Sequence, residues 1–449
     1  MNELEKLLSD FDPIKRKNAL IKLISDTDIS KIPTQNNVNM HFHSFFSFNS
    51  EGWSPSRIAW EAKKVGLFSV GIVDFDVIDG MDEFIDAAEL LSLRASVGVE
   101  TRSFFAKFAN FEMDSPGEPG VNYVMGVGFT QHFPDESVQA KKLTDYRENA
   151  KKRNLNLIKR INEKLKDIAL SYEEDVIPLT PSGNATERHI ITAYGNKALK
   201  KLGDKAFSYL SEILERKSDE IKNIFYSSRP GFDELLRSKL VKKGGIGYLQ
   251  PSKETFPPMD EFLQWVKSCG AIPTEAWLDG TTNGEALGLK YIEASKAEGA
   301  MAINIIPDRN WNIKDSQTQK IKLAKLKEIV DAANTLNMPI FIGTEMNKSG
   351  QPLYDDLDCN ALRPFKQTFI RGASIAIGHS ILARFAKLPY SADATDNIFK
   401  STEEKNDFYE KVGKLPPLNK KISENLSKFN PDEIFAKIAD SAKKGCWNI

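Results

Sequence analysis

The segment Val38-Asn39-Met40-His41-Phe42-His43 carries two of the five histidines of the chain on what its pattern predicts to be a short strand. Side chains at positions i and i+2 of a strand share one face. His41 and His43 can therefore point together at one cation. An isolated His-x-His pair is also compatible with packed or solvated histidines, so the residues that follow must decide between the two interpretations.

Residues 54–100 add two helices and two strands to this first strand. Ser54-Pro55 is a typical helix start, and each helical pattern is followed by an apolar run that ends in a carboxylate, Asp74 in the first run and Glu100 in the second. This β-α-β-α-β order is the unit of a parallel sheet. Because the carboxyl ends of the strands form the active face of β/α architectures, we expect both carboxylates beside the two histidines at one mouth.

At these residues the chain resembles the PHP family (polymerase and histidinol phosphatase), whose members are metal-dependent phosphoesterases with a distorted β/α barrel. The resemblance is close over residues 37–102 and looser over 270–385. It lies in three motifs that keep the order of the family: His41-Phe42-His43, then Val73-Asp74-Phe75-Asp76 with Asp79-Gly80, and finally Val97-Gly98-Val99-Glu100. The resemblance implies an α/β fold, a TIM-barrel-like, distorted (β/α)7 PHP-type barrel.

The rest of the chain predicts helical additions to this barrel. The pattern is helical and lysine-rich from about 141 to 170 and helical again from about 196 to 241, whereas the β/α alternation returns between 259 and 345. Counting from His41 gives about seven strands. We expect five parts: a helical N-terminal arm (1–35), the first part of the barrel (36–134), a mainly helical insertion (135–255), the second part of the barrel (256–390) and a C-terminal helical extension (391–449).

Composition and charge favour an ordinary soluble, cytoplasmic protein. The 449 residues carry a net charge of −1, so no overall basic field favours nucleic acid. The three cysteines are few and far apart, as in a reducing compartment, and neither a secretion signal nor an apolar run long enough for a membrane is present. The N-terminal arm would pack either on the barrel or on a second subunit, and the oligomeric state stays open.

The resemblance also implies one divalent metal ion, held by four side chains from distant parts of the chain. Two imidazoles and two carboxylates suit zinc, manganese or iron. The family binds further cations, but here Phe75 and Asn347 stand where it has histidines, and a phenyl ring cannot be a ligand. We therefore predict one ion, or at most two, rather than three. The predicted ligands are His41, His43, Glu100 and Glu345.

Other candidate residues would bind substrate or transfer protons. The segment 180–190 predicts a helix start that suits an anion and resembles the Arg-Pro-His-Ile-Ala segment of PHP phosphoesterases. Each of these residues also has a structural interpretation. Arg188 and His189 could make structural hydrogen bonds in a capped helix, Arg309 could form a surface ion pair with Asp308, and the backbone could satisfy His379. We assign Arg188, His189 and Arg309 to substrate binding, Asp74 or Asp76 to the general base, and His379 to a donor in the catalytic set.

These observations predict a metal-dependent hydrolase, a phosphoesterase that attacks a small phosphorylated or otherwise anionic substrate with a metal-activated water. Two alternatives remain. One is a degenerate PHP barrel that binds a metal or metabolite without hydrolysis, and the other is a metal enzyme of another reaction class, because one barrel supports many chemistries.

Overall fold

The computed structural model describes residues 3–449 and contains one seven-stranded sheet whose strand order is the order of the chain. Neighbouring strands are parallel except for the fourth, which runs antiparallel to both of its neighbours. The strands are β1 (Val38–Phe42), β2 (Ser69–Phe75), β3 (Ala95–Phe104), β4 (Val121–Val127), β5 (Ile272–Trp277), β6 (Ala302–Ile305) and β7 (Ile340–Ile342). The predicted α/β fold with about seven strands is confirmed.

The two edges of the sheet meet and nearly close it into a barrel. Phe42 and Glu345 form a parallel bridge just beyond β7. The Glu345 amide donates to the His41 carbonyl, and the His43 amide donates to the Glu345 carbonyl, both at 2.8 Å. The main chain therefore holds Glu345 at the same end of the barrel as the two histidines, as predicted.

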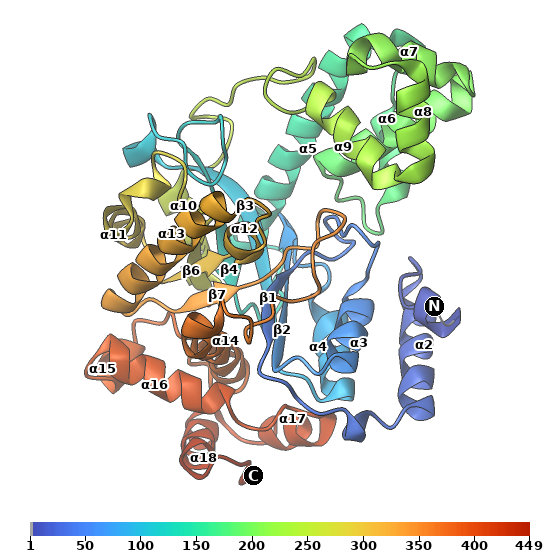
Figure 1. Ribbon diagram of the computed structural model, residues 1–449. Helices are drawn as coiled ribbons and strands as arrows, with labels where there is room; N and C mark the ends of the chain where they lie inside the picture. The colour runs from blue at the N-terminus through green and yellow to red at the C-terminus, as the bar shows by residue number, and fades with distance from the viewer. Residues whose placement is uncertain (1–2) are drawn as a thin grey trace.

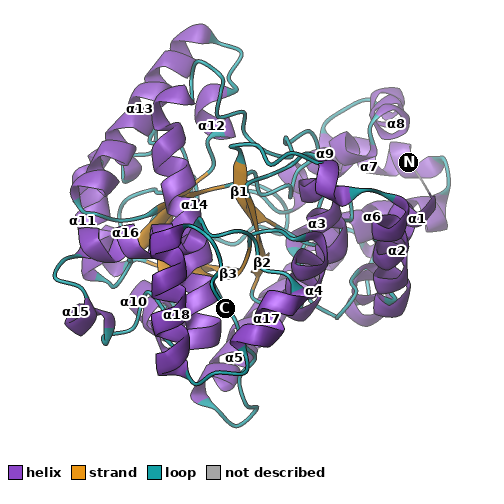
Figure 2. Ribbon diagram, turned by 90° about the horizontal axis from the view of Figure 1, so that it is seen from below, coloured by secondary structure: helices purple, strands orange, loops and turns teal. Residues whose placement is uncertain are grey.

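Helices cover the outside of the barrel, and in Figure 2 they surround the strands. The first of them begins where the sequence predicts, because the Ser54 hydroxyl accepts from the Arg57 amide and Pro55 occupies the first turn. The helices around the barrel are α3 (Pro55–Lys64), α4 (Met81–Leu91), α10 (Met259–Ser268), α11 (Leu289–Ala297), α12 (Asp308–Trp311), α13 (Ser316–Thr335) and α14 (Lys366–Ile381).

The antiparallel strand β4 departs from the β/α alternation. A parallel connection needs a crossover, usually a helix, but residues 105–120 between β3 and β4 hold only one short helical turn and loops. The chain therefore turns back directly and pairs Glu100 with Met125. As a result, Glu100 lies in the middle of a ten-residue strand and not at its end.

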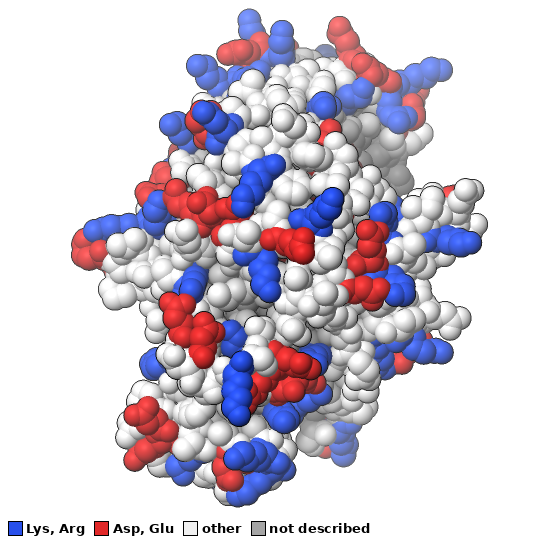
Figure 3. All heavy atoms as spheres, turned by 90° about the vertical axis from the view of Figure 1, so that its left-hand side faces the viewer, with Lys and Arg blue, Asp and Glu red and all other residues white. Residues whose placement is uncertain are grey.

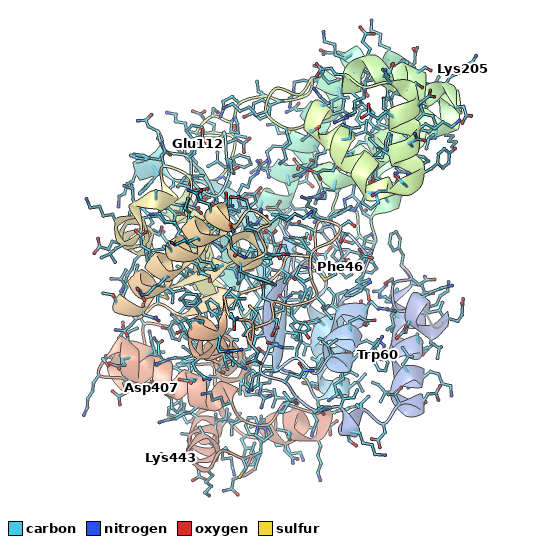
Figure 4. The ribbon with its side chains drawn as sticks, viewed as in Figure 1. Phe46, Trp60, Glu112, Lys205, Asp407 and Lys443 are labelled. Atoms are coloured by element: carbon cyan, nitrogen blue, oxygen red, sulfur yellow. The ribbon has the colours of Figure 1, made fainter. Side chains whose placement is uncertain are left out.

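A helical insertion stands apart from the barrel, at the upper right of Figure 1. Its buried apolar side chains, from Leu157 to Val241, form a core separate from the barrel core. Asn184 docks it on the barrel by donating to the carbonyls of Phe46 and Phe75, and Phe46 is labelled at this junction in Figure 4. The insertion helices are α5 (Val138–Lys164), α6 (Glu187–Leu202), α7 (Lys205–Leu214), α8 (Ser218–Ser227) and α9 (Arg229–Leu240).

The N-terminal arm packs on the barrel of its own chain. The Ser54 hydroxyl donates to the Leu8 carbonyl, and Arg16, which is buried, pairs with Glu83 of α4. The arm contains α1 (Glu3–Leu7) and α2 (Pro13–Asp26), and the C-terminal extension contains α15 (Thr395–Ile398), α16 (Thr402–Gly413), α17 (Lys420–Leu426) and α18 (Pro431–Lys444).

The surface carries both signs of charge in close mixture. On the face shown in Figure 3, lysine and arginine side chains alternate with aspartate and glutamate, in agreement with the net charge of −1. Within residues 3–449, none of the helices combines the length and the apolarity that crossing a bilayer requires.

Candidate metal centre

Three of the four predicted metal ligands converge inside the barrel mouth. The Glu100 Oε2 atom lies 3.6 Å from His41 Nε2 and 3.3 Å from His43 Nε2, and one ligand atom from each residue falls within 4.8 Å of the other two. All three atoms are buried, and within residues 3–449 none has a hydrogen-bond partner. Because buried polar groups are almost always paired, three unpaired atoms that face one point fit a bound cation. The residues present could therefore hold a divalent metal.

The histidine tautomers agree with this interpretation. His41 Nδ1 lies 2.9 Å from Oδ1 of Asn304 on β6. An amide oxygen can only accept, so Nδ1 carries the proton and the lone pair of Nε2 faces Glu100. Hydrogen bonds of this kind on the far nitrogen are typical of metal-binding histidines.

Electrostatics keep the carboxylate of the centre ionised. Burial works to raise the pKa of Glu100, but the adjacent His41 and His43 outweigh it and hold the pKa at about 2. For His41, burial opposes the charged form, yet Glu100 raises its pKa above the ordinary value. The pocket thus stabilises positive charge next to a carboxylate, whether a proton or a metal supplies that charge.

The fourth predicted ligand, Glu345, reaches the same mouth but has another partner. Its Oε2 accepts from Arg309 at 2.8 Å and from Gln351 at 3.3 Å. Burial works to raise the pKa of Glu345, but Arg309 and His41 hold it below the ordinary value. Its side chain is not part of the group of three whose ligand atoms lie within 4.8 Å.

Phe75 closes one side of the centre. Its ring stacks on His43 with the centroids 4.5 Å apart and the planes 15° from parallel. A phenyl ring in this place supplies packing and no ligand. Phe75 therefore provides no metal ligand on this side of the centre.

A large cavity of about 1370 Å³ opens above the centre, between the barrel mouth and the insertion. His41, Glu100 and Asn304 lie in its wall together with residues of α5, α6 and α9. Besides Glu345, three more of the sequence-predicted site residues line it, namely Asp76, Arg188 and Arg309.

These three residues have defined partners. Asp76 has a left-handed backbone with φ of 59°, accepts from the Thr101 hydroxyl at 2.6 Å, and has its pKa raised by burial. Arg188 pairs with Glu234 at 3.3 Å. Arg309 pairs with the Glu345 carboxylate, so the predicted surface ion pair with Asp308 is not the one that forms.

The prediction for His379 is wrong. Its Nδ1 accepts from the Tyr390 amide at 2.9 Å, so Nε2 carries the proton and donates to the Gly128 carbonyl at 3.0 Å. His379 belongs to the last turn of α14, its ring is fully buried outside the cavity, and burial lowers its pKa to about 4. The backbone satisfies His379, which was the structural alternative.

The structure also does not place Asp74 as a catalytic residue or His189 as a substrate-binding residue. His189 Nδ1 accepts from the Thr186 amide, so the ring caps α6, and burial lowers the pKa of the imidazole to about 4. Asp74 accepts from the Ser44 amide and from the hydroxyls of Ser44 and Ser47. Neither side chain is in the cavity wall.

Sequence reasoning missed Arg153 of α5. Its guanidinium lies 3.9 Å from Asp76 Oδ2 and packs over the Phe256 ring at 4.9 Å. It faces the cavity from the insertion side. The sequence did not single out Arg153, because the basic residues of a lysine-rich helix usually form its solvent-exposed face.

Comparisons with known proteins show a similarity of fold only. No family model and no curated protein matches the chain. Solved structures that resemble it include an amidohydrolase from Chromobacterium violaceum with bound sulfate and no metal (TM-score 0.49, 15% identity, 74% of this chain and 95% of that one). Another is a candidate metal-dependent phosphoesterase from Bifidobacterium adolescentis (TM-score 0.46, 16% identity, 75% of this chain and 98% of that one).

Proposed function

We propose that this protein is a metal-dependent hydrolase that cleaves a phosphoester in a small anionic molecule. The observation that carries the proposal is the convergence of His41 Nε2, His43 Nε2 and Glu100 Oε2, all buried and without a partner among residues 3–449, beside a wide cavity whose wall includes His41 and Glu100. A divalent cation in this position would activate a bound water and withdraw charge from a phosphoryl oxygen.

The surrounding residues support a role for each part of the reaction. Of the two aspartates predicted as general base, Asp76 faces the cavity, 2.6 Å from the Thr101 hydroxyl, and would orient the attacking water. Arg153 and Arg309 approach from two sides and would bind the substrate oxygens, since guanidinium groups match the geometry of phosphate. Both arginines pair with carboxylates next to the triad, which keeps them in place before substrate arrives.

One observation favours a second candidate, a barrel that binds a metal or metabolite without hydrolysis. Arg309 already occupies the Glu345 carboxylate, so the centre has three close ligands in place of four. Three protein ligands also leave a position open for water, which is the arrangement of catalytic zinc sites. We therefore keep hydrolysis as the main proposal.

Metal content and turnover test the proposal together. We expect the protein purified with manganese, zinc or iron to retain about one ion per chain and to hydrolyse members of a phosphoester panel. His41→Gln, His43→Gln and Glu100→Gln should each lower turnover by roughly 100-fold or more, because second-shell changes alone cost about 10–100-fold. His132→Gln is the matched control, since His132 is exposed and pairs only with Asp82.

The outcomes separate the candidates. A retained ion without turnover on any panel member would favour the binding protein. A wild-type chain that takes up no divalent ion would refute the metal-dependent hydrolase and leave only a barrel that binds a metabolite.

A further inference from the structure

A series of hydrogen bonds connects His43, the second histidine of the centre, to groups on the side away from the cavity. His43 Nδ1 lies 3.3 Å from the Ser47 hydroxyl, and that hydroxyl lies 2.6 Å from Asp74 Oδ1. All three side chains are at most 2% exposed. The chain of contacts thus connects a buried carboxylate to the ring nitrogen opposite the one that faces Glu100.

We propose that Asp74 and Ser47 are positioning residues that keep the proton of His43 on Nδ1 and so keep Nε2 free for the metal. This inference rests on the proposed metal centre. A hydroxyl has one proton, and Ser47 gives it to Asp74 at a short distance. At His43 the same oxygen can then only accept, which requires a proton on Nδ1 and leaves the lone pair on Nε2.

The alternative tautomer explains why such a device is needed. With the proton on Nε2, His43 could donate to Glu100 Oε2, 3.3 Å away. That hydrogen bond would satisfy both groups and close the centre without a metal. The hydrogen bonds from Asp74 through Ser47 oppose this tautomer. If the proton moved to Nε2, the Ser47 oxygen and His43 Nδ1 would face each other as two acceptors with no proton between them.

The loop that supplies Ser47 also offers a matched control. Ser44 and Ser47 are both fully buried, and each donates to Asp74 at 2.6 Å, one to each carboxylate oxygen. Only the Ser47 hydroxyl contacts His43. Ser44→Ala therefore removes the same kind of hydrogen bond from the same carboxylate without touching the histidine.

The test compares wild type, Ser47→Ala, Ser44→Ala and Asp74→Asn. In metal-free protein labelled with ¹⁵N-histidine, with His43 assigned from the spectrum of His43→Gln, we expect Nδ1–H in wild type and Ser44→Ala and a shift toward Nε2–H in Ser47→Ala. Affinity for Zn²⁺ or Mn²⁺, measured by chelator competition, should fall about 10–100-fold in Ser47→Ala and less in Asp74→Asn. Ser44→Ala should bind like wild type.

Two results would overturn the inference. One is an unchanged tautomer in Ser47→Ala, and the other is an equal loss of affinity in Ser44→Ala and Ser47→Ala. If the wild-type chain binds no metal, the proposed function fails, whereas the tautomer measurement on metal-free protein still decides the role of Ser47. Should Asp74→Asn fail to fold, the two serine variants decide the question alone.

Discussion

Buried ionisable side chains are not confined to the metal centre, and Glu275 on β5 shows what such a residue costs. It is fully buried, and its Oε1 accepts from Asn122 and from the Tyr291 hydroxyl, while its Oε2 has no partner. Burial raises the pKa of Glu275 from an ordinary value of 4.5 to about 8. The folded protein therefore prefers this carboxyl in its neutral form.

Stability should consequently depend on pH through Glu275. Between about pH 4.5 and 8 the folded state keeps a proton that the unfolded state releases, so the stabilisation present below pH 4.5 is lost as pH rises through 8. Glu275→Gln cannot lose a proton and should flatten this decline, by at most about 1.4 kcal/mol per pKa unit. The free energy of unfolding, measured with urea at pH 5.5 and 8.5, shows the size of this decline in each variant.

Glu293→Gln is the control for this experiment, because Glu293 lies exposed on α11, the helix that also carries Tyr291. It should follow the pH dependence of wild type. An identical decline in wild type and Glu275→Gln would show that Glu275 is ionised in the folded protein at neutral pH.

Among the elements, the seam between β1 and β7 determines whether the centre exists. Gly343 follows β7 where the main chain comes closest to the first strand. A Cβ atom there would lie 2.4 Å from His41 Cβ and 2.6 Å from the His41 amide nitrogen. The seam closes only because this residue has no side chain, and its closure places Glu345 next to the two histidines.

Gly343→Ala should therefore damage stability and metal binding together. Overpacking of this kind typically costs about 1–3 kcal/mol, and the atoms that would have to move belong to His41. We expect a lower urea midpoint and a weaker affinity for Zn²⁺. The control is Gly231→Ala in α9, where an added methyl would meet only side-chain atoms at 3.0 Å or more; a similar loss of metal affinity in both variants would contradict the assignment.

The protein as a whole is built on two hydrophobic cores, one in the barrel and one in the insertion. The cavity lies between them and takes its wall from both. Stability need not be uniform across such an arrangement, since segments with their own core can open separately. The insertion should thus be able to loosen while the metal centre stays intact.

Leu236→Ala tests this separation. Leu236 is fully buried in the insertion core, and removing such a side chain typically costs about 2–5 kcal/mol. We expect faster amide hydrogen exchange in α6 to α9 and unchanged exchange in β1 to β3, with Zn²⁺ affinity preserved. Leu263→Ala, in the barrel core, is the counterpart and should accelerate exchange in the barrel. Uniform acceleration in both variants would show one cooperative unit.

Sequence patterns predicted the elements well because their signals are local. Ser54-Pro55 caps α3 as expected, and the apolar runs became strands. His41 and His43 point the same way because they are two positions apart in an extended segment, and they meet Glu100 of β3. The helical insertion likewise followed from the change of period.

Contacts between distant segments could not be read in the same way. His379 looks like a catalytic residue in the sequence, but its two ring nitrogens are satisfied by the backbone of Gly128 and Tyr390. Asp74 follows an apolar run exactly as a catalytic aspartate would, yet its oxygens turn toward the serines of the preceding loop.

The amino-acid pattern predicted an α/β fold with about seven strands and two histidines on one strand face, since hydrophobic period and strand alternation act over a few residues. The barrel and the remaining metal ligands were implied by the resemblance to the PHP family. The fold was needed to place Arg153 against Asp76, Arg309 against Glu345 and Asn304 against His41. Each of these pairs joins residues at least 36 positions apart, and closure of the barrel and docking of the insertion bring them together.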